Sequence, residues 1–399
     1  MTEKLYQDNP YLFEFASRVI SVHEGESGYV VVLEATAFYP ESGGQLYDTG
    51  AIEGIPILNV IEKDTGEIIH ILERGNLSPG MTVNGQIDRV RRLDNMRKHT
   101  GQHILSRAFI EVAAADTVSS RLGEVESTIE LSLESLDDTV LRSVEELANN
   151  IIRQNQPVKI EYYEREALKN LPVRKIPERE GKFRIVQVGE FDYTACGGTH
   201  CRNAGEVGMV KIIGQEKLRG HLRVIFLVGR QAEEDYCEKH TVVNQLSGRL
   251  TCHFRDLVKG VDKLTEQNTA LRREVSLLSG RLLAVDLKEL AENSPDLGGI
   301  KIVTGEFDGR DPKALKDAAN KLGETVRAII LLLCGDKLLI FAPAGIKLTA
   351  SAMSRLFMER FGGKGGGSAT SAQVGGIAMD KRKEYIDHFI GLIRGEIAP

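Results

Sequence analysis

Two short segments far apart in the sequence carry side chains that bind metal ions. In RKHTGQHIL, His99 and His103 stand four positions apart at the start of a helical pattern. One helical turn brings both imidazoles to the same face. In CGGTH, two glycines let a turn direct the Cys196 thiolate and the His200 imidazole to one point. Three nitrogens and one sulfur suit a tetrahedral Zn²⁺ site, so we expect one zinc ion per chain.

Each pair of residues also has a simpler interpretation. Histidines at i and i+4 occur often by chance, and Cys196 with Cys201 could form a redox pair. The chain has five cysteines, an odd number, which disfavours a disulfide framework. Cys237 and His240 have a similar spacing but stand among Glu and Lys in a helical segment, which indicates a solvent-facing surface. The pair His99 and His103 and the pair Cys196 and His200, taken together, favour a metal site.

The bulk composition predicts a folded protein with several domains. A chain of 399 residues, 42% of them hydrophobic, is long enough for roughly two to four domains. The opening MTEKLYQDNPYLFEF is unlike a signal peptide, and no stretch reaches the roughly 18 apolar residues of a membrane span. We therefore expect a cytoplasmic protein without membrane contacts. The formal charge of −6 gives no overall attraction to RNA, so any RNA contact must be local.

The pattern of the chain predicts an α+β multi-domain protein in four parts. Residues 1–90 contain short β-rich runs separated by turns, which favour a small β-barrel. Residues 91–230 mix helical and strand patterns, as an α+β zinc-binding domain would. Residues 231–295 contain a helical, coiled-coil-like linker, and residues 296–399 are typical of an α/β domain.

A heptad pattern runs through residues 257–285. Val261, Asn268, Val275 and Leu282 fall on position a, and leucine occupies position d four times. Parallel two-stranded coiled coils favour this distribution, so we expect a homodimer through 257–285. The alternative is a helical hairpin within one chain, because glycines at 260 and 280 weaken a long helix.

The order of these motifs resembles a known family. HTGQH, followed later by CGGTH and preceded by TAFYPESGGQLYDTG, is similar to the editing domain of alanyl-tRNA synthetases and to the freestanding AlaX trans-editing proteins. This resemblance covers residues 1 to about 230. The tail FGGKGGGSATSAQVGG resembles the glycine-rich end of the DHH-associated domain, so the whole chain looks like a long-form AlaX. No part of it resembles the aminoacylation core, and we expect it to edit tRNA and not to charge it.

The resemblance implies roles for individual residues. The metal ligands of the family fall on His99, His103, Cys196 and His200. Thr36 takes the position that is associated in the family with recognition of a serine hydroxyl. Alternatively, Thr36 is an ordinary β-branched strand residue without such a role. The substrate loop corresponds to Gly43, Gly44 and Gln45, with Ser42 where many relatives have a further glycine. Thr36, Gln45 and Gln102 are the candidate catalytic residues, although Gln102 could act only by supporting the histidines between which it stands.

The implied activity is that of an aminoacyl-tRNA deacylase, a carboxylic ester hydrolase. It would chiefly cleave serine from the 3′ end of mischarged tRNA(Ala), and the sequence leaves open whether it also cleaves glycine. A buried group that bonds the serine hydroxyl is left unpaired by alanine, and such sites reject the deoxy analogue by about 10⁴-fold. Glycine has no hydroxyl, so its removal needs a size limit. Either zinc keeps all four protein ligands and organises the pocket, or one ligand yields to water or substrate.

Two segments could contact RNA outside the reaction centre. The basic run at 89–99, with Arg97 and Lys98, either binds the terminal phosphates or forms a solvated helix face. The glycine-rich segment 362–376 either presents backbone N–H groups to phosphate or forms a mobile loop. Lys364 is followed by glycine, so the Walker pattern is absent and ATP is not implied. By resemblance, the tail domain would bind the tRNA body.

Other functions are compatible with the same motifs. A non-catalytic RNA-binding protein could use the four ligands only for stability. An editing module for Ser-tRNA(Thr) would carry related zinc motifs. A DHH phosphoesterase is disfavoured because the chain contains no Asp-His-His triplet.

Overall fold

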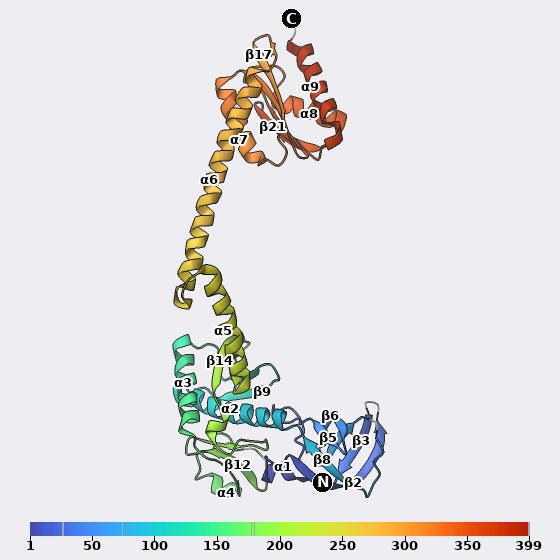
Figure 1. Ribbon diagram of the computed structural model, residues 1–399, viewed down its shortest axis with the longest axis vertical. Helices are drawn as coiled ribbons and strands as arrows, with labels where there is room; N and C mark the ends of the chain where they lie inside the picture. The colour runs from blue at the N-terminus through green and yellow to red at the C-terminus, as the bar shows by residue number, and fades with distance from the viewer. Residues whose placement is uncertain (26–27, 74, 177, 179, 398–399) are drawn as a thin grey trace. The chain divides into compact units, whose positions relative to one another are not determined.

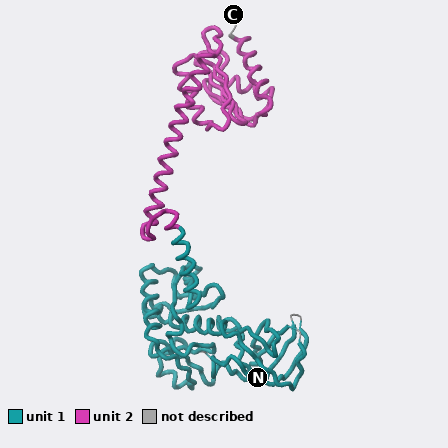
Figure 2. The backbone as a smooth tube through the Cα atoms, in the orientation of Figure 1, with its two compact units in different colours: residues 1–245 teal, residues 246–399 magenta. Residues whose placement is uncertain are grey.

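The computed structural model describes residues 1–25, 28–73, 75–176, 178 and 180–397. The chain divides into two compact units, residues 1–245 and 246–399, and each is described by itself (Figure 2). Across the described ranges, no helix is long and apolar enough to cross a membrane. Both units combine helices with strands, which confirms the α+β class. The four-part division of the chain stays a prediction.

The first part of unit 1 is a closed six-stranded barrel, as the sequence predicts (Figure 1). Its strands, in spatial order, are β2 (Glu14–Gly25), β3 (Gly28–Leu33), β7 (Ile68–Leu72), β6 (Ile55–Glu62), β5 (Gly50–Ile52) and β8 (Thr82–Ile87). Exposed and buried side chains alternate along β8 and the first half of β2, as expected when one face of a strand lines a core. The short strands β1 (Glu3–Lys4) and β4 (Ala35–Thr36) pair in parallel, and α1 (Leu5–Asp8) follows β1.

A buried histidine binds Thr36 in this part of the molecule. His70, on β7, is fully buried, and its Nδ1 lies 3.2 Å from the Val31 carbonyl oxygen. Because a carbonyl oxygen only accepts, Nδ1 carries the proton, and Nε2 accepts from the Thr36 hydroxyl at 2.8 Å. The same hydroxyl oxygen accepts the Phe38 N–H at 3.1 Å. Burial lowers the pKa of His70 to about 4, so the ring is neutral.

Helix α2 (Arg89–Ala113) carries the two predicted histidine ligands. The Asp88 side chain caps its start by accepting two backbone N–H groups. Arg92 is fully buried, pairs with buried Asp48 and donates to two backbone carbonyls. Since a buried charge is costly when it is unpaired, this network fixes the start of the helix. Within the basic run, Arg92 is therefore neither a phosphate contact nor part of a solvated face.

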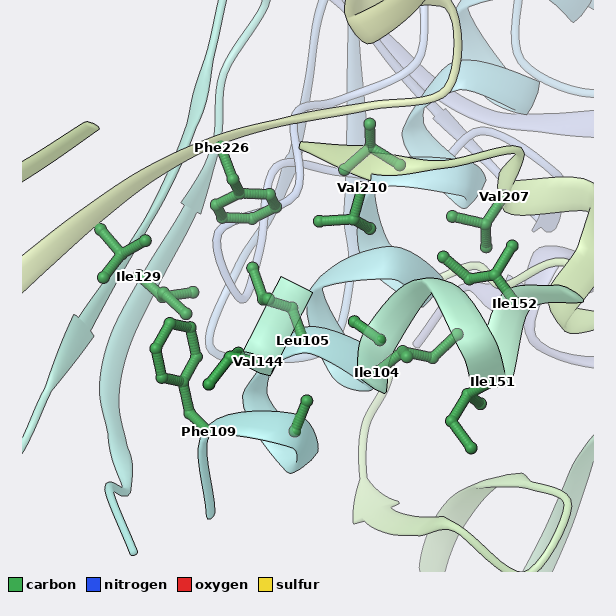
Figure 3. Packing of buried hydrophobic residues seen from close by; sticks show 14 of the residues in the cluster. Ile104, Leu105, Phe109, Ile129, Val144, Ile151, Ile152, Val207, Val210 and Phe226 are labelled. Atoms are coloured by element: carbon green, nitrogen blue, oxygen red, sulfur yellow. The ribbon is translucent and has the colours of Figure 1, made fainter. Parts of the chain in front are cut away.

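The rest of unit 1 packs α2 and α3 (Asp138–Gln154) against a four-stranded antiparallel sheet. The sheet has the order β14 (Val210–Leu218), β15 (His221–Val228), β10 (Ser127–Leu131) and β9 (Thr117–Leu122). Figure 3 shows Leu105 and Phe109 beside Val144 and the strand residues Ile129 and Phe226. This packing holds α2 in the core of the unit.

A second, three-stranded antiparallel sheet carries the CGGTH loop. It consists of β11 (Val158–Tyr163), β12 (Phe183–Val188) and β13 (Asp192–Ala195). CGGTH follows β13 directly. The remaining elements of this part are α4 (Arg165–Leu168), η1 (Ala204–Val207) and the start of α5 (Arg230–Leu250).

Unit 2 is a mixed six-stranded sheet with helices on both faces. After η2 (Phe254–Asp256) and α6 (Leu257–Glu292), the sheet has the order β16 (Asp296–Leu297), β17 (Ile300–Glu306), β18 (Ala328–Cys334), β19 (Lys337–Phe341), β21 (Ser371–Gly375) and β20 (Lys364–Gly367). Alternate residues of buried β18 point to opposite faces. One face packs on α6 and α7 (Pro312–Thr325), and the other packs on α8 (Ala350–Phe361) and α9 (Arg382–Ile397), which follows η3 (Met379–Lys381).

The glycine-rich segment is the edge strand of this sheet. Residues 364–367 form β20, which pairs in antiparallel register with β21. A Cβ at Gly365 or Gly367 would overlap the backbone of β21. The glycines therefore permit close approach of two strands, and the expectation of a mobile loop is wrong for these residues.

The heptad seam lies on α6 and faces solvent. Val261, Leu264, Leu271, Val275 and Leu278 are each 50–62% exposed. Among the described residues of unit 2, none covers this stripe. The described part of unit 2 therefore supplies no hairpin partner for the seam.

We predict that His70 makes the stability of the barrel depend on pH. Its pKa is about 4 in the folded chain, whereas an exposed histidine titrates near 6.5. The unfolded chain thus binds a proton that the folded chain excludes. Above pH 6.5, His70 has little effect on the free energy of unfolding. As the pH drops toward 4, this free energy falls by up to about 1.4 kcal/mol per pH unit because of His70.

His70→Gln should remove this part of the slope. This pH dependence is measured by hydrogen exchange of peptides covering β3 and β7, corrected for the intrinsic exchange rates. The control His23→Gln, at an exposed position on β2, should keep the slope of the unaltered protein. An unchanged slope in His70→Gln would contradict the neutral, buried state of this ring.

Candidate metal centre

The structure brings the four predicted ligands together. His99 and His103 come from α2, and Cys196 and His200 come from the loop after β13. One donor atom of each lies within 4.8 Å of the others. The Cys196 sulfur is 3.3 Å from His99 Nε2 and 3.4 Å from His200 Nε2. The three imidazoles are buried and Cys196 is partly buried, so the cluster could hold a metal ion away from bulk solvent.

The second nitrogen of each imidazole faces a polar side chain. His99 Nδ1 donates to Gln45 Oε1 at 2.7 Å, which leaves its Nε2 lone pair directed at the cluster. His200 Nδ1 lies 3.3 Å from Thr100 Oγ1, and His103 Nδ1 lies 3.6 Å from Asp192 Oδ2. Histidines that bind metals characteristically have such partners, which set the orientation and the tautomer of the ring.

Gln45 connects the two halves of the cluster. Besides the bond to His99, its Oε1 accepts the Thr199 N–H at 3.2 Å, and its Nε2 donates to Thr199 Oγ1 at 2.8 Å. Gln45 is fully buried and does not line the cavity described below. The structure thus places Gln45 behind the ligands, where it can orient them.

The electrostatics of the cluster fit a divalent cation. Burial lowers the pKa of His99 to about 3, and it lowers the pKa values of His103 and His200 well below the ordinary range. All three rings are therefore neutral donors. Burial also raises the pKa of the Cys196 thiol, against the Gly198 N–H and two nearby arginines, so a bound cation would favour the thiolate. Three imidazoles and one sulfur suit a tetrahedral site.

A cavity of about 880 Å³ opens beside the cluster. His99, His103 and Cys196 contribute to its wall. The rest of the wall includes residues from α1, from the loop that follows β4, from strand β9 and from the segment around Arg174, together with Gln102, Lys4 and Glu62. The cavity is large enough for a small organic group placed next to the candidate metal.

The predicted substrate loop lies partly on this cavity. Gly43 lines it, and Gly44 turns behind it against β9, where a Cβ at Gly44 would overlap the Ser120 carbonyl. Both glycines have positive φ, at 57° and 82°. Ser42 does not have a positive φ, so its backbone conformation does not require glycine.

The other predicted residues are placed differently. Gln102 lines the cavity, and its Nε2 donates to Ser106 Oγ at 2.7 Å. Thr36 is fully buried, does not line the cavity and gives its hydroxyl proton to His70. Arg97 donates to the Glu206 carbonyl and Lys98 to the Gly123 carbonyl, and neither lines the cavity. These contacts limit how Arg97 and Lys98 could reach a phosphate.

The cysteine alternatives find no support. All five cysteines are free, including buried Cys201. Cys237 and His240 are exposed on α5, as the sequence indicates. Only Cys196 joins a cluster of metal-binding side chains in the described chain.

Several supporting residues escaped the sequence analysis. Asp192 is fully buried, faces His103 and forms an ion pair with Arg174 at 2.8 Å. Burial raises the pKa of this carboxyl, against the effect of Arg174. The threonines within HTGQH and CGGTH were visible signals, because each motif contains a hydroxyl between its ligands. Asp192 and Arg174 belong to no motif and carried no such signal.

Comparisons with known proteins place the chain in a family. Residues 7–91 match the family described as tRNA synthetases class II (A), and residues 183–225 match the threonyl and alanyl tRNA synthetase second additional domain. These two segments are thus similar to parts of class II tRNA synthetases. The chain is 31% identical over the full length of both chains to the alanyl-tRNA editing protein AlaX-L of Pyrococcus horikoshii. The chain belongs to the AlaX family of alanyl-tRNA editing proteins.

Three further similarities concern two larger proteins and one smaller one. The alanine–tRNA ligase of Archaeoglobus fulgidus is 32% identical over 97% of this chain, which spans 43% of that ligase. The alanine–tRNA ligase of Pyrococcus furiosus is 30% identical, again with 43% of its length matched. The C-Ala domain of Aquifex aeolicus alanyl-tRNA synthetase matches 27% of the chain at 25% identity, with a TM-score of 0.23.

We predict that Gly198→Ala weakens metal binding. A Cβ at Gly198 would overlap the His99 ring and push it away from the cluster. Displacing an oriented ligand typically costs about 10–100-fold in affinity. Titration of the metal-free protein with Co²⁺, followed by its visible absorption, measures the change.

Gly197→Ala is the matched control. Its nearest atom would be Gln7 Nε2 at 4.0 Å, an ordinary contact, so Co²⁺ affinity should stay unchanged. Equal affinities for the two variants would contradict the placement of His99 in the cluster.

Proposed function

We propose that this protein is a zinc-dependent deacylase that removes serine and glycine from mischarged tRNA(Ala) in the cytoplasm. The observation that carries the proposal is the convergence of His99, His103, Cys196 and His200 beside a cavity. The chain also matches an alanyl-tRNA editing protein from end to end. One Zn²⁺ per chain is the cation that this donor set favours.

The chain's own residues bind and orient the aminoacyl group. A bound zinc would supply a Lewis acid for the ester and a centre around which the pocket is organised. Gln102 lines the cavity with its Nε2 held by Ser106, which leaves Oε1 as an acceptor for the amino acid. Gln45 holds His99 and the CGGTH loop in place.

Thr36 supports selection of serine through the loop that it precedes. Its hydroxyl accepts the Phe38 N–H, and Tyr39 lines the cavity. Thr36 is fully buried and does not line the cavity, so a direct bond to a serine hydroxyl would require it to move. We therefore assign Thr36 a positioning role, with Gly43 as part of the substrate surface.

The body of the tRNA and a second copy of the chain are the proposed partners. We assign tRNA binding to residues 296–399 by resemblance, and Arg97 and Lys98 stay candidate phosphate contacts at the edge of the site. Homodimerisation through 257–285 is supported by the exposed seam of α6. A parallel coiled coil would bury its leucines and valines.

Two other functions are compatible with some of the same observations. A protein that only binds RNA would keep the cluster but would have no need of a cavity at the ligands. Editing of Ser-tRNA(Thr) is favoured by one observation, because the matched domain is described for threonyl and alanyl synthetases together. The matches along nearly the whole chain are to alanyl proteins, which favours tRNA(Ala).

We predict that Cys196→Ser loses zinc and deacylase activity. Loss of a ligand should lower the hydrolysis of Ser-tRNA(Ala) by at least about 100-fold. Release of labelled serine measures the rate, and elemental analysis measures zinc. Cys237→Ser, an exposed cysteine outside the cluster, is the control and should retain both. Full activity in protein verified to be free of zinc would contradict the proposal.

The same assay separates the candidate substrates. We expect hydrolysis of Ser-tRNA(Ala) and Gly-tRNA(Ala), with Ala-tRNA(Ala) spared by up to about 10⁴-fold relative to serine. Faster hydrolysis of Ser-tRNA(Thr) than of Ser-tRNA(Ala) would transfer the assignment to threonine tRNA.

We predict that the double variant Leu271→Asp/Leu278→Asp is monomeric. Both side chains are more than half exposed, so their loss leaves the core of unit 2 intact, whereas two buried carboxylates would oppose a coiled-coil seam. Sedimentation equilibrium measures the mass. The control Arg273→Asp, on the opposite side of the heptad, should stay dimeric. A monomeric unaltered protein would overturn the proposed dimer.

A further inference from the structure

A second cavity, of about 470 Å³, lies next to the candidate metal centre in unit 1. It shares Lys4, Gln7 and the segment 195–197 with the wall of the first cavity. Its other lining residues come from β11, from β12 and from the residue just before β12. A chain-like ligand that fills the first cavity with its end can therefore continue into the second.

The strand register puts the distinctive side chains of this cavity on one face. Tyr162 and Arg184 are direct partners in the antiparallel pair of β11 and β12. Directly opposite residues share a face of a sheet, and Lys182 stands two positions before Arg184 on the same side. Tyr162 is half exposed and Lys182 is exposed, so both are open to a ligand.

The cavity is cationic. Three of its lining residues are Lys4, Lys182 and Arg184, and none is acidic. Two carboxylates lie at its margin, since Glu62 pairs with Lys4 and Glu164 lies 3.9 Å from Lys182. With these two carboxylates counted, three positive and two negative charges leave a net excess of one positive charge at the cavity.

Arg184 fixes part of this charge. It is only 6% exposed and donates to the Cys196 carbonyl at 2.6 Å and to the Gln7 carbonyl at 3.3 Å. Its buried Nε has no hydrogen-bond partner among the described residues. Both accepting carbonyls are neutral, so the guanidinium charge is not cancelled by its own contacts, and an anion in the cavity would be stabilised.

We propose that the second cavity binds the penultimate nucleotide of the tRNA acceptor end. The phosphodiester that joins it to the terminal adenosine lies against Lys4, Lys182 and Arg184, and its base stacks on Tyr162. Cations and aromatic rings together are what single-stranded RNA requires of a binding groove. The inference rests on the proposed deacylase function, because the first cavity must hold the aminoacylated adenosine.

Two serine esters of different length test this assignment on the full chain. One is a seryl minihelix that ends in CCA, and the other is 2′(3′)-O-seryl-adenosine, which lacks the penultimate nucleotide. For Tyr162→Ala/Lys182→Ala we expect KM for the minihelix to rise about tenfold with kcat unchanged, since one stacked base and one phosphate contact are lost. Hydrolysis of seryl-adenosine should be the same as in the unaltered protein. The slope of log KM against log salt should fall by about 0.7.

Matched variants exclude a general effect on the fold. Tyr162→Phe keeps the ring and should keep the original KM. Lys159→Ala removes an exposed lysine on the opposite face of β11 and should also change nothing. An unchanged KM and salt slope in the double variant, or an equal loss on both substrates, would overturn the inference.

A binding measurement separates this inference from the proposed function. If the unaltered protein cleaves neither ester, the deacylase assignment has failed. Fluorescence anisotropy with an uncharged CCA-ended minihelix then decides the inference alone. About tenfold weaker binding by the double variant than by Lys159→Ala supports it, and equal binding contradicts it.

Discussion

Three neutral imidazoles and a thiol that face one another inside a protein cannot all pair with one another, and a cation between them would satisfy all four. Burial keeps the rings of His99, His103 and His200 neutral, and the single thiol proton of Cys196 can serve only one ring nitrogen at a time. A divalent metal satisfies all four donors at once and favours the thiolate form of Cys196. In our proposal, the local structure of unit 1 depends on this one interaction.

The surrounding elements can be understood as supports for that centre. The buried pair of Arg92 and Asp48 fixes the start of α2, so the helix presents its two histidines from a defined position. Gly101, between them, allows the helix to pack closely on Val207 and Val228, where a Cβ would crowd both side chains. Gln45 then joins this helix to the CGGTH loop.

The same loop separates two cavities of different chemistry. On the metal side, the ligands and Gln102 line a space for an aminoacyl group. On the other side, the Cys196 carbonyl anchors Arg184 within a cationic wall. In our proposal, a single backbone segment connects the cavity for the reacting end of the substrate with the cavity for the adjoining nucleotide.

The sequence predicted the features that depend on local pattern. Ligand spacing in HTGQH and CGGTH, strand alternation in the barrel and the heptads of 257–285 each follow from a short-range rule. The roles of Asp192 and Arg184 depend instead on strand register, and that of Arg174 on a loop that meets Asp192, so residues from separate segments come together. Arg92 illustrates the limit, since its neighbours suggested an RNA contact and its burial depends on Asp48, far away in the chain.

The glycine-rich tail shows the same limit in unit 2. Its composition is compatible with a loop, and only pairing with β21 explains why residues 364–367 form a strand. Composition alone does not specify which partner a backbone meets. Features set by long-range pairing therefore had to come from the structure.

X-ray absorption at the zinc K-edge of the purified protein tests the central claim most directly. The account predicts one zinc per chain with a single sulfur neighbour at about 2.3 Å and three imidazole nitrogens at about 2.0–2.1 Å. A spectrum without the sulfur shell, or a protein that holds no stoichiometric zinc under conditions where it is folded, would contradict it.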